Sequence, residues 1–169
     1  MFQVGDTVIL PHHGAGTVTD IEELQVLGSD NLYYSIKLFD ESKTFVWIPV
    51  KDAEKQGVRH PIRKSQLGQI WRVLRAEPQE LPTDHNKRYE FLLEKLCGGN
   101  LFQVAEAVKD LFWRNHCTRN LTIKGKRLYD RGMMFLASEV AVVQGSDFAV
   151  AEARISDILG TSLASRPAV

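Results

Sequence analysis

The apolar positions of this chain change their spacing about one third of the way along it. Up to residue 53, short apolar runs rich in β-branched residues alternate with turn residues, as in "DTVIL", "GTVTDIEEL", "LYYSIKLF" and "TFVWIPV". Such runs are typical of strands, and "VLGSDN" at 26–31 and "DESK" at 40–43 are typical of turns. About five short strands are expected, enough for a small Tudor- or SH3-like β-barrel with open edges.

From residue 63 onward the apolar residues recur three and four positions apart, which indicates amphipathic helices. The first stripe consists of Leu67, Ile70, Trp71 and Leu74. Further helices are predicted to begin near Thr83, Asn100, Thr122 and Ser146. The expected fold is α+β with two domains: the barrel at 1–53, a linker at 54–62, an all-α bundle of about five helices at 63–160, and a flexible tail at 161–169.

The stretch "VILPHHGAGTV" at 8–18 contains adjacent histidines and a Gly-x-Gly pattern. A phosphate-binding loop needs a helix after its glycines, whereas Gly16 leads into the predicted strand "TVTDI". Side chains of adjacent extended residues point to opposite faces, so His12 and His13 are poorly placed to share a metal ion. We interpret the stretch as a turn in which glycine permits a positive φ angle.

Composition narrows the class of protein. The chain is 44% hydrophobic and 25% charged, which is ordinary for a globular protein. No apolar run approaches the ~20 residues of a membrane span, and "MFQVGDTVIL" lacks the features of a signal peptide. Cys97 and Cys117 form no CxxC pair. We therefore expect a cytoplasmic protein with reduced thiols and no membrane partner.

A net charge of zero hides an asymmetry along the chain. Residues 1–53 carry 3 lysines and arginines against 8 acidic residues, a net charge of −5. Residues 54–143 carry 16 against 10, a net charge of +6. This division indicates two modules with different partners, and it favours an anionic partner for the second.

The basic residues of the predicted bundle concentrate near helix ends. Short loops make consecutive helices roughly antiparallel, which would gather the end of the first, the start of the second, the end of the third and the start of the fourth. Near these ends lie Arg72, Arg75, Lys87, Arg88, Arg114, Arg119, Lys124, Lys126 and Arg127. With two helix N-termini at the same place, they predict a surface for a phosphate backbone. A solvated face with no partner is the alternative.

The sequence offers few candidates for a catalytic or metal-binding site. No catalytic motif is evident in the sequence, and we expect neither a cofactor nor a metal site. His116 and Cys117 are adjacent, so a small Cys-His enzyme remains a second alternative. Trp47 alternates with Val46 and Ile48 in "FVWIPV". We expect it to face outward and to act as an interface anchor.

Several segments resemble one family in their order and spacing. "FQVGDTVILPHHGAGTV", "IPV", "GVR", "VLR", "PTDHNKRYEFLLEKL", "VAEAVKDL" and "KRL" follow, over residues 2–160, the pattern of the CarD/CdnL family of bacterial transcription regulators. The resemblance implies that residues 1–53 correspond to the polymerase-interacting domain shared with transcription-repair coupling factor. That domain pairs a barrel edge with the lobe of the RNA polymerase β subunit. The helical module would lie on promoter DNA at the upstream fork of the transcription bubble and stabilise the open complex.

Candidate site residues follow from these patterns and from the resemblance. The expected contacts with the phosphate backbone and minor groove of promoter DNA are His85, Lys87, Arg88, Lys124, Lys126 and Arg127. The expected contacts with the polymerase are Leu24, Val26, Val46, Trp47 and Ile48. His85 stands where the family usually has a tryptophan wedge, and Leu24 and Trp47 stand where it often has arginines. We expect a non-enzymatic monomer, and the alternative is a protein-binding adaptor with little DNA engagement.

Overall fold

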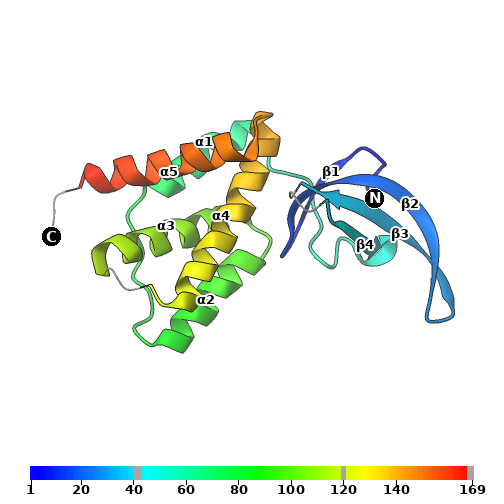
Figure 1. The fold of residues 1–169 in the computed structure, drawn as a ribbon, viewed down its shortest axis with the longest axis horizontal. Helices are drawn as coiled ribbons and strands as arrows, with labels where there is room; N and C mark the ends of the chain where they lie inside the picture. Colours follow the sequence, from blue (N-terminus) through cyan, green and yellow to red (C-terminus); the bar gives the residue numbers. More distant parts are fainter. Residues whose placement is uncertain (40–42, 119–120, 167–169) are drawn as a thin grey trace. The chain divides into compact units, whose positions relative to one another are not determined.

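The computed structural model describes residues 1–39, 43–118 and 121–166. The chain divides into two compact units, Met1–Pro61 and Ile62–Val169, which we call unit 1 and unit 2. Unit 1 contains the strands and unit 2 the α-helices (Figure 1). The α+β two-domain prediction is therefore confirmed. Most of the turn predicted at 40–43, the basic residue Arg119 and the last three residues lie outside the described ranges.

Unit 1 is built on one antiparallel sheet. Its strands are β1 (Thr7–Leu10), β2 (Gly14–Val26), β3 (Ser29–Leu38) and β4 (Phe45–Pro49), followed by a short 3-10 helix, η1 (Val50–Asp52). Neighbours in sequence are neighbours in the sheet, in the order β1-β2-β3-β4. The described residues thus contain four strands rather than about five, because β2 and β3 form one long, curved hairpin (Figure 1).

The predicted turn at the opening histidines is present between β1 and β2. His12 and Gly14 both have positive φ angles, 71° and 86°, as the turn requires. Gly16 is needed for a different reason. A Cβ atom at this position would lie 2.8 Å from the Ile36 side chain and from the Lys37 carbonyl oxygen, so only glycine lets β2 approach β3 this closely.

The core of unit 1 extends past the predicted domain boundary. Side chains from all four strands pack together, and the Tyr34 hydroxyl accepts a hydrogen bond from the Phe2 backbone N–H (3.0 Å). Val58 is buried in the same core, and Arg59 exchanges backbone hydrogen bonds with Ile9 (2.7 and 3.1 Å). The linker predicted at 54–62 is therefore corrected: residues 54–61 belong to unit 1, because they complete its core and cover the outer side of β1.

Unit 2 contains the five predicted helices. They are α1 (Leu67–Arg75), α2 (His85–Cys97), α3 (Leu101–Thr118), α4 (Ile123–Gln144) and α5 (Phe148–Ala164), with a short 3-10 helix, η2 (Lys64–Gln66), before α1. The predicted cap Thr122 accepts a hydrogen bond from the Gly125 N–H (3.1 Å). Because α5 continues to Ala164, the predicted tail at 161–169 begins inside a helix.

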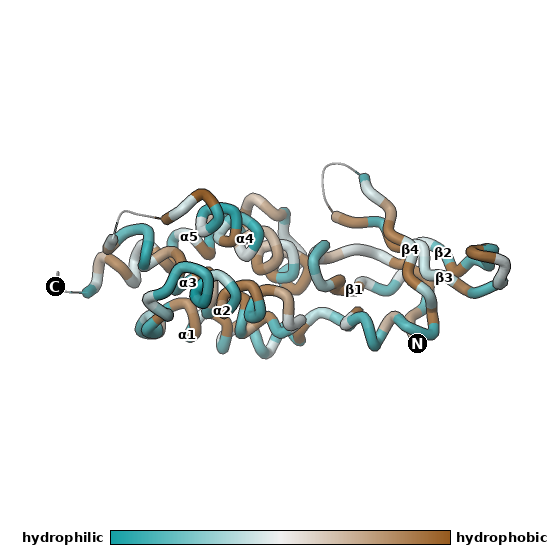
Figure 2. Tube along the Cα trace, turned by 90° about the horizontal axis from the view of Figure 1, so that it is seen from below, coloured by the Kyte–Doolittle hydropathy of each residue, from teal (hydrophilic) through white to brown (hydrophobic). Residues whose placement is uncertain are grey.

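The core of unit 2 centres on α3, which packs against α1, α2 and α4. Apolar and polar residues alternate along the helices (Figure 2), and the buried residues of α3 include Val104, Val108 and Leu111. Gly132 of α4 lies where a Cβ atom would come within 2.8 Å of the Val108 side chain and 2.9 Å of the Leu96 side chain. This close contact holds α4 against both α2 and α3.

The described helices were compared with the length and apolar composition of a membrane span. None of the described helices is by itself long and apolar enough to cross a membrane. Among them, only α4 and α5 taken together have the length and apolar composition of a membrane span, and the chain bends by 113° between them.

Candidate functional site

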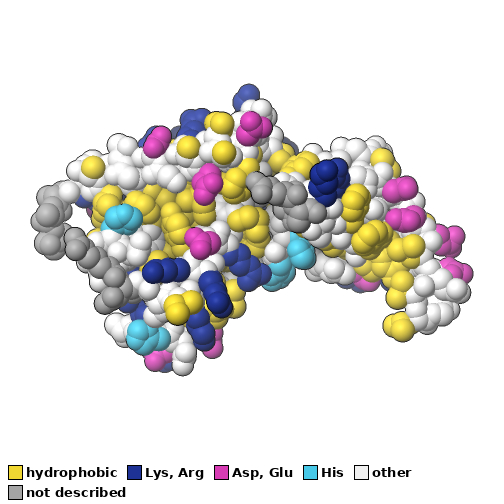
Figure 3. Space-filling view, viewed as in Figure 1, with side chains coloured by type: hydrophobic (Ala, Val, Ile, Leu, Met, Phe, Trp, Pro, Cys, Tyr) yellow, Lys and Arg dark blue, Asp and Glu magenta, His cyan; other side chains and the backbone are white. Residues whose placement is uncertain are grey.

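The outer face of the sheet in unit 1 carries exposed aromatic side chains. Trp47 is 49% exposed and Phe45 43% exposed, and their ring centroids lie 6.1 Å apart. The Trp47 indole N–H donates a hydrogen bond to Glu22 Oε1 (3.0 Å), which fixes the ring across β2 and β3. Figure 3 shows apolar side chains gathered on the visible surface of unit 1, with acidic side chains beside them.

The register divides the predicted polymerase contacts between two faces. Pairs Glu22↔Tyr33, Leu24↔Asn31 and Val26↔Ser29 place Leu24 and Val26 on the same face as Trp47. Val46 and Ile48 point the other way, because adjacent residues of a strand alternate between faces. Ile48 is buried in the core and Val46 packs against it. The outer-face residues of the predicted set are thus Leu24, Val26 and Trp47, whereas the side chains of Val46 and Ile48 face the core.

Strand β4 is the open edge of this sheet. It pairs with β3 on one side, and no further described strand pairs with its other side. The opposite edge, β1, is partly covered by the bridge between Ile9 and Arg59. An unpaired edge presents backbone N–H and C=O groups that can pair with a strand of another chain.

In unit 2, three of the four predicted helix ends meet around one cavity. The start of α2, the end of α3 and the start of α4 line a space of about 380 Å³, which we call the basic cavity. His85, Arg88, Arg114 and Lys124 supply its polar wall, and leucines from the three helices supply its floor. None of the described residues that line it is acidic. The surroundings therefore favour an anion.

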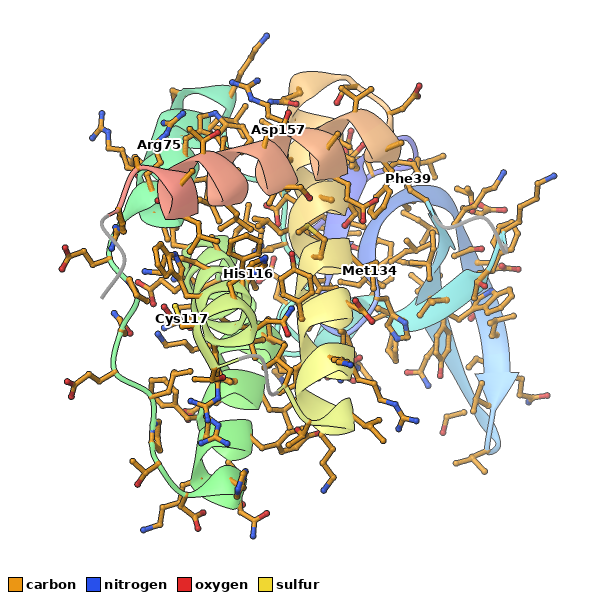
Figure 4. The ribbon with its side chains drawn as sticks, turned by 60° about the vertical axis from the view of Figure 1, so that its left-hand side comes forward. Phe39, Arg75, His116, Cys117, Met134 and Asp157 are labelled. Carbon is orange, nitrogen blue, oxygen red and sulfur yellow. The ribbon has the colours of Figure 1, made fainter. Side chains whose placement is uncertain are left out.

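The prediction that the end of α1 joins this group is wrong. The Arg75 carbonyl accepts hydrogen bonds from Ser162 and Arg166, so α1 ends beside α5 (Figure 4). The segment from 76 to 84 is not a short loop but runs along α3. Lys109 Nζ donates to the Glu77 carbonyl (2.8 Å), and Asp110 Oδ1 accepts from the Gln79 N–H (3.0 Å).

Arg88 is a buried member of the predicted DNA-binding set. It is only 8% exposed, and its guanidinium donates to the carbonyls of Pro82 (3.0 Å) and Thr83 (3.1 Å) and to His85 Nδ1 (2.8 Å). Because a guanidinium can only donate, His85 Nδ1 is the acceptor and carries no proton in this arrangement. Arg88 thus fixes the start of α2, whereas Lys87, Lys124, Lys126 and Arg127 remain exposed to solvent.

The two helix N-termini at this end differ electrostatically. The Asp84 carboxylate caps α2 by accepting from the N–H groups of Asn86 (3.0 Å) and Lys87 (2.9 Å), and so neutralises that terminus. Thr122, which is uncharged, caps α4. Of the two N-termini that the sequence predicted as anion sites, the α4 terminus is the one that keeps its positive potential.

Arg114 lines the basic cavity, although the sequence placed it only among the basic residues near helix ends and not among the expected DNA contacts. Burial, and then the neighbouring charge of Arg88, lower the pKa of its side chain from the usual value. The crowding of two guanidinium groups comes from the meeting of α2 and α3, which the sequence pattern could not locate.

The adjacent pair His116 and Cys117 lies at the exposed end of α3 (Figure 4). The His116 ring stacks on Phe112 (4.1 Å between centroids), and its Nδ1 lies 2.9 Å from the Phe112 carbonyl oxygen. Both interactions are with the preceding turn of the same helix, as expected for a helix end. Among the described residues, no group of three histidine, cysteine or acidic side chains is placed to hold a metal ion.

Comparison with known proteins defines the class. Residues 2–64 match the family described as "CarD-like/TRCF RID domain", and residues 69–156 match "CarD, C-terminal domain". The chain belongs to the CarD family of transcription factors, which is a non-enzymatic family. It is 30% identical over 145 residues to "Putative transcription factor YdeB" of Bacillus subtilis (strain 168), an alignment that covers 86% of this chain and 94% of that protein. The predicted family and the expectation of a non-enzymatic protein are confirmed.

Proposed function

We propose that this chain binds the RNA polymerase β subunit through unit 1, contacts promoter DNA through unit 2 without sequence preference, and stabilises the open complex at the upstream fork of the bubble. In this proposal it acts as a monomer in the cytoplasm and joins the nucleoid through the polymerase. The observation that carries the proposal is the combination, in the unit that matches the RID domain, of an open β4 edge with the exposed Trp47.

The polymerase contact is supported by two physically different features of one surface. The β4 edge offers backbone groups for strand pairing, which gives affinity with little dependence on side chains. Trp47 beside it presents a large ring that the Glu22 hydrogen bond already orients, so little conformational entropy is lost on binding. Leu24 and Phe45 extend the apolar area on the same face.

The DNA contact is supported by the exposed basic residues around the starts of α2 and α4. Lys87, Lys126 and Arg127 are free to reach phosphates, and Lys124 stands at the rim of the basic cavity. Contacts of this kind position a protein on a duplex but carry no sequence information. We therefore propose weak, salt-dependent binding that becomes effective when the polymerase holds the protein next to the fork.

A polymerase-binding adaptor with little DNA engagement is the second candidate. It is favoured by the burial of Arg88, whose hydrogen bonds are already made within α2 and the segment before it. Salt-dependent binding of the full chain to duplex DNA distinguishes the two functions, since the adaptor has no reason to show it.

Open-complex lifetime on the cognate polymerase tests the proposed function. The full chain should lengthen the lifetime, and Trp47→Ala should remove most of the effect by releasing the protein from the polymerase. The double variant Lys126→Gln with Arg127→Gln should bind the polymerase normally and yet lengthen the lifetime less. An unchanged lifetime in the presence of bound wild-type protein would contradict the proposal and support the adaptor.

A further inference from the structure

The basic cavity has two kinds of wall, which a surface for phosphate groups alone would not need. Leu92, Leu111 and Leu128 are buried core residues that also form its floor. Tyr89 adds a half-buried aromatic ring, with Lys124 Nζ 5.4 Å from the ring centroid. A ligand that fills this space gains by covering apolar surface and, a few ångströms away, by neutralising positive charge.

The charged wall of the cavity is arranged so that one group is left for a ligand. The Arg88 guanidinium already donates hydrogen bonds to the carbonyls of Pro82 and Thr83 and to His85 Nδ1. Arg114 lines the same cavity, and among the described residues no acceptor is bonded to its guanidinium. The two cations repel each other, which is one cause of the lowered pKa of Arg114. A bound anion would relieve that repulsion.

The start of α4 adds to the anion-binding side of the cavity. Thr122 and Gly125 both line it, and the Thr122 hydroxyl oxygen accepts from the Gly125 N–H, which leaves the hydroxyl hydrogen able to donate to a ligand. Because the cap is neutral, the helix terminus keeps its attraction for negative charge. Arg114, Lys124 and Thr122 thus lie on the polar side, with the leucine floor beneath them.

A nucleotide matches both walls, since it joins a flat, largely apolar base to a phosphate. A cavity of about 380 Å³ is within the size range of small-ligand sites. Lys87, Lys126 and Arg127 are exposed and lie next in the chain to residues that line the cavity. They would hold neighbouring phosphates of a strand, which a free mononucleotide does not have. These residues favour DNA as the source of the nucleotide.

We propose that the basic cavity receives one unpaired nucleotide of DNA, with its base on the leucine floor and its phosphate on Arg114 and Lys124. The inference rests on the proposed function, because it assumes that unit 2 engages DNA. It adds that unit 2 takes a base into a hollow of its own and so distinguishes opened from paired DNA.

The test is equilibrium binding of the full chain to three end-labelled duplexes of the same sequence. One is fully paired, one carries a single unpaired 2-aminopurine nucleotide, and one carries an abasic residue at that position. The bulged duplex should bind about tenfold more tightly than the paired one, and the abasic duplex should lose this preference, because burial of the base against the apolar floor supplies it. The fluorescence of 2-aminopurine reports directly whether the base is taken up.

Two variants and one control locate the effect. Arg114→Gln should remove the preference for the bulged duplex, and Leu121→Trp should remove it by filling the cavity from its half-buried edge. Arg72→Gln removes the same charge from an exposed position on α1 outside the cavity and should keep the preference. Circular dichroism and thermal melting establish that each variant is folded, and Arg114→Gln keeps the test decisive if Leu121→Trp is not.

Three results overturn the proposal. Equal, salt-dependent affinity for all three duplexes contradicts it while leaving the proposed function intact. No binding to any duplex contradicts both. Binding of free 2-aminopurine deoxyriboside 5′-monophosphate, without any preference for the bulged duplex, assigns the cavity to a soluble nucleotide instead of to DNA.

Discussion

The two units present opposite kinds of surface. Unit 1 is acidic in sequence and exposes apolar rings and an open strand edge, whereas unit 2 exposes cations at a cavity whose described lining residues include no carboxylate. Apolar contact and strand pairing depend little on salt, but phosphate contacts release counterions and weaken steeply as salt rises. The two proposed partners should therefore be held by interactions that respond differently to salt.

The largest effect is expected where unit 2 holds its own buried charges. Lys109 and Asp110 are both almost fully buried, and burial raises the pKa of the Asp110 carboxyl despite the nearby lysine. Lys109→Met leaves that carboxylate without its partner and frees the Glu77 carbonyl, so the free energy of unfolding of unit 2 should fall by about 3–5 kcal/mol. Chemical denaturation of the full chain, followed by helix signal, measures the loss.

The same variant tests whether the polymerase affinity of unit 1 depends on the stability of unit 2. With unit 2 destabilised, polymerase binding through unit 1 should keep its wild-type affinity at temperatures where unit 1 is folded. A parallel loss of polymerase affinity would show that the two units do not act independently.

A smaller effect is expected at the outer face of unit 1. Trp47→Ala removes the exposed ring and its hydrogen bond to Glu22, and should weaken polymerase binding by about 2 kcal/mol, the size of a hot spot. Phe148→Ala is the matched control, since it removes an exposed aromatic side chain from unit 2. Titration against core polymerase measures both, and equal affinities for the two variants would exclude Trp47 from the interface.

The smallest effect separates two adjacent basic residues of α2. Lys87 is exposed, so Lys87→Gln should reduce the slope of log affinity for duplex DNA against log salt by about one unit. Arg88 is buried and bonded to backbone carbonyls, so Arg88→Gln should lower the stability of unit 2 instead. DNA titrations at several salt concentrations, with a melting curve for each variant, distinguish the roles. A full unit of slope lost in folded Arg88→Gln would mean that Arg88 reaches a phosphate after all.

Much of the fold could be predicted from the sequence because it depends on local periodicity. The stripe from Leu67 to Leu74 and the cap at Thr122 are short-range signals, and both correspond to structure. The place of Val58 was missed because its partners in the core lie on strands far away in sequence. The long path of residues 76–84 was missed because it is held by Lys109 and Asp110, whose side chains belong to a different helix.

The candidate sites divide in the same way. Alternation in "FVWIP" placed Trp47 outward and would equally have identified Phe45. Arg88 was expected to contact DNA on account of its charge. It is buried instead, because its guanidinium donates to the carbonyls of the segment before α2. The carboxylate of Asp84, a recognisable N-cap in "TDH", changes the electrostatics of α2, and its effect follows from the residue alone.

The most direct test of the central claim is the salt dependence of both affinities of the full chain. Binding to fully paired duplex DNA and to core polymerase should be measured over the same range, from about 50 to 200 mM monovalent salt. With three or four phosphate contacts, DNA affinity should fall roughly 100-fold across this range, whereas polymerase affinity should change less than about threefold. Parallel salt dependence of the two affinities would contradict the account, because it would mean that both partners are held by the same kind of surface.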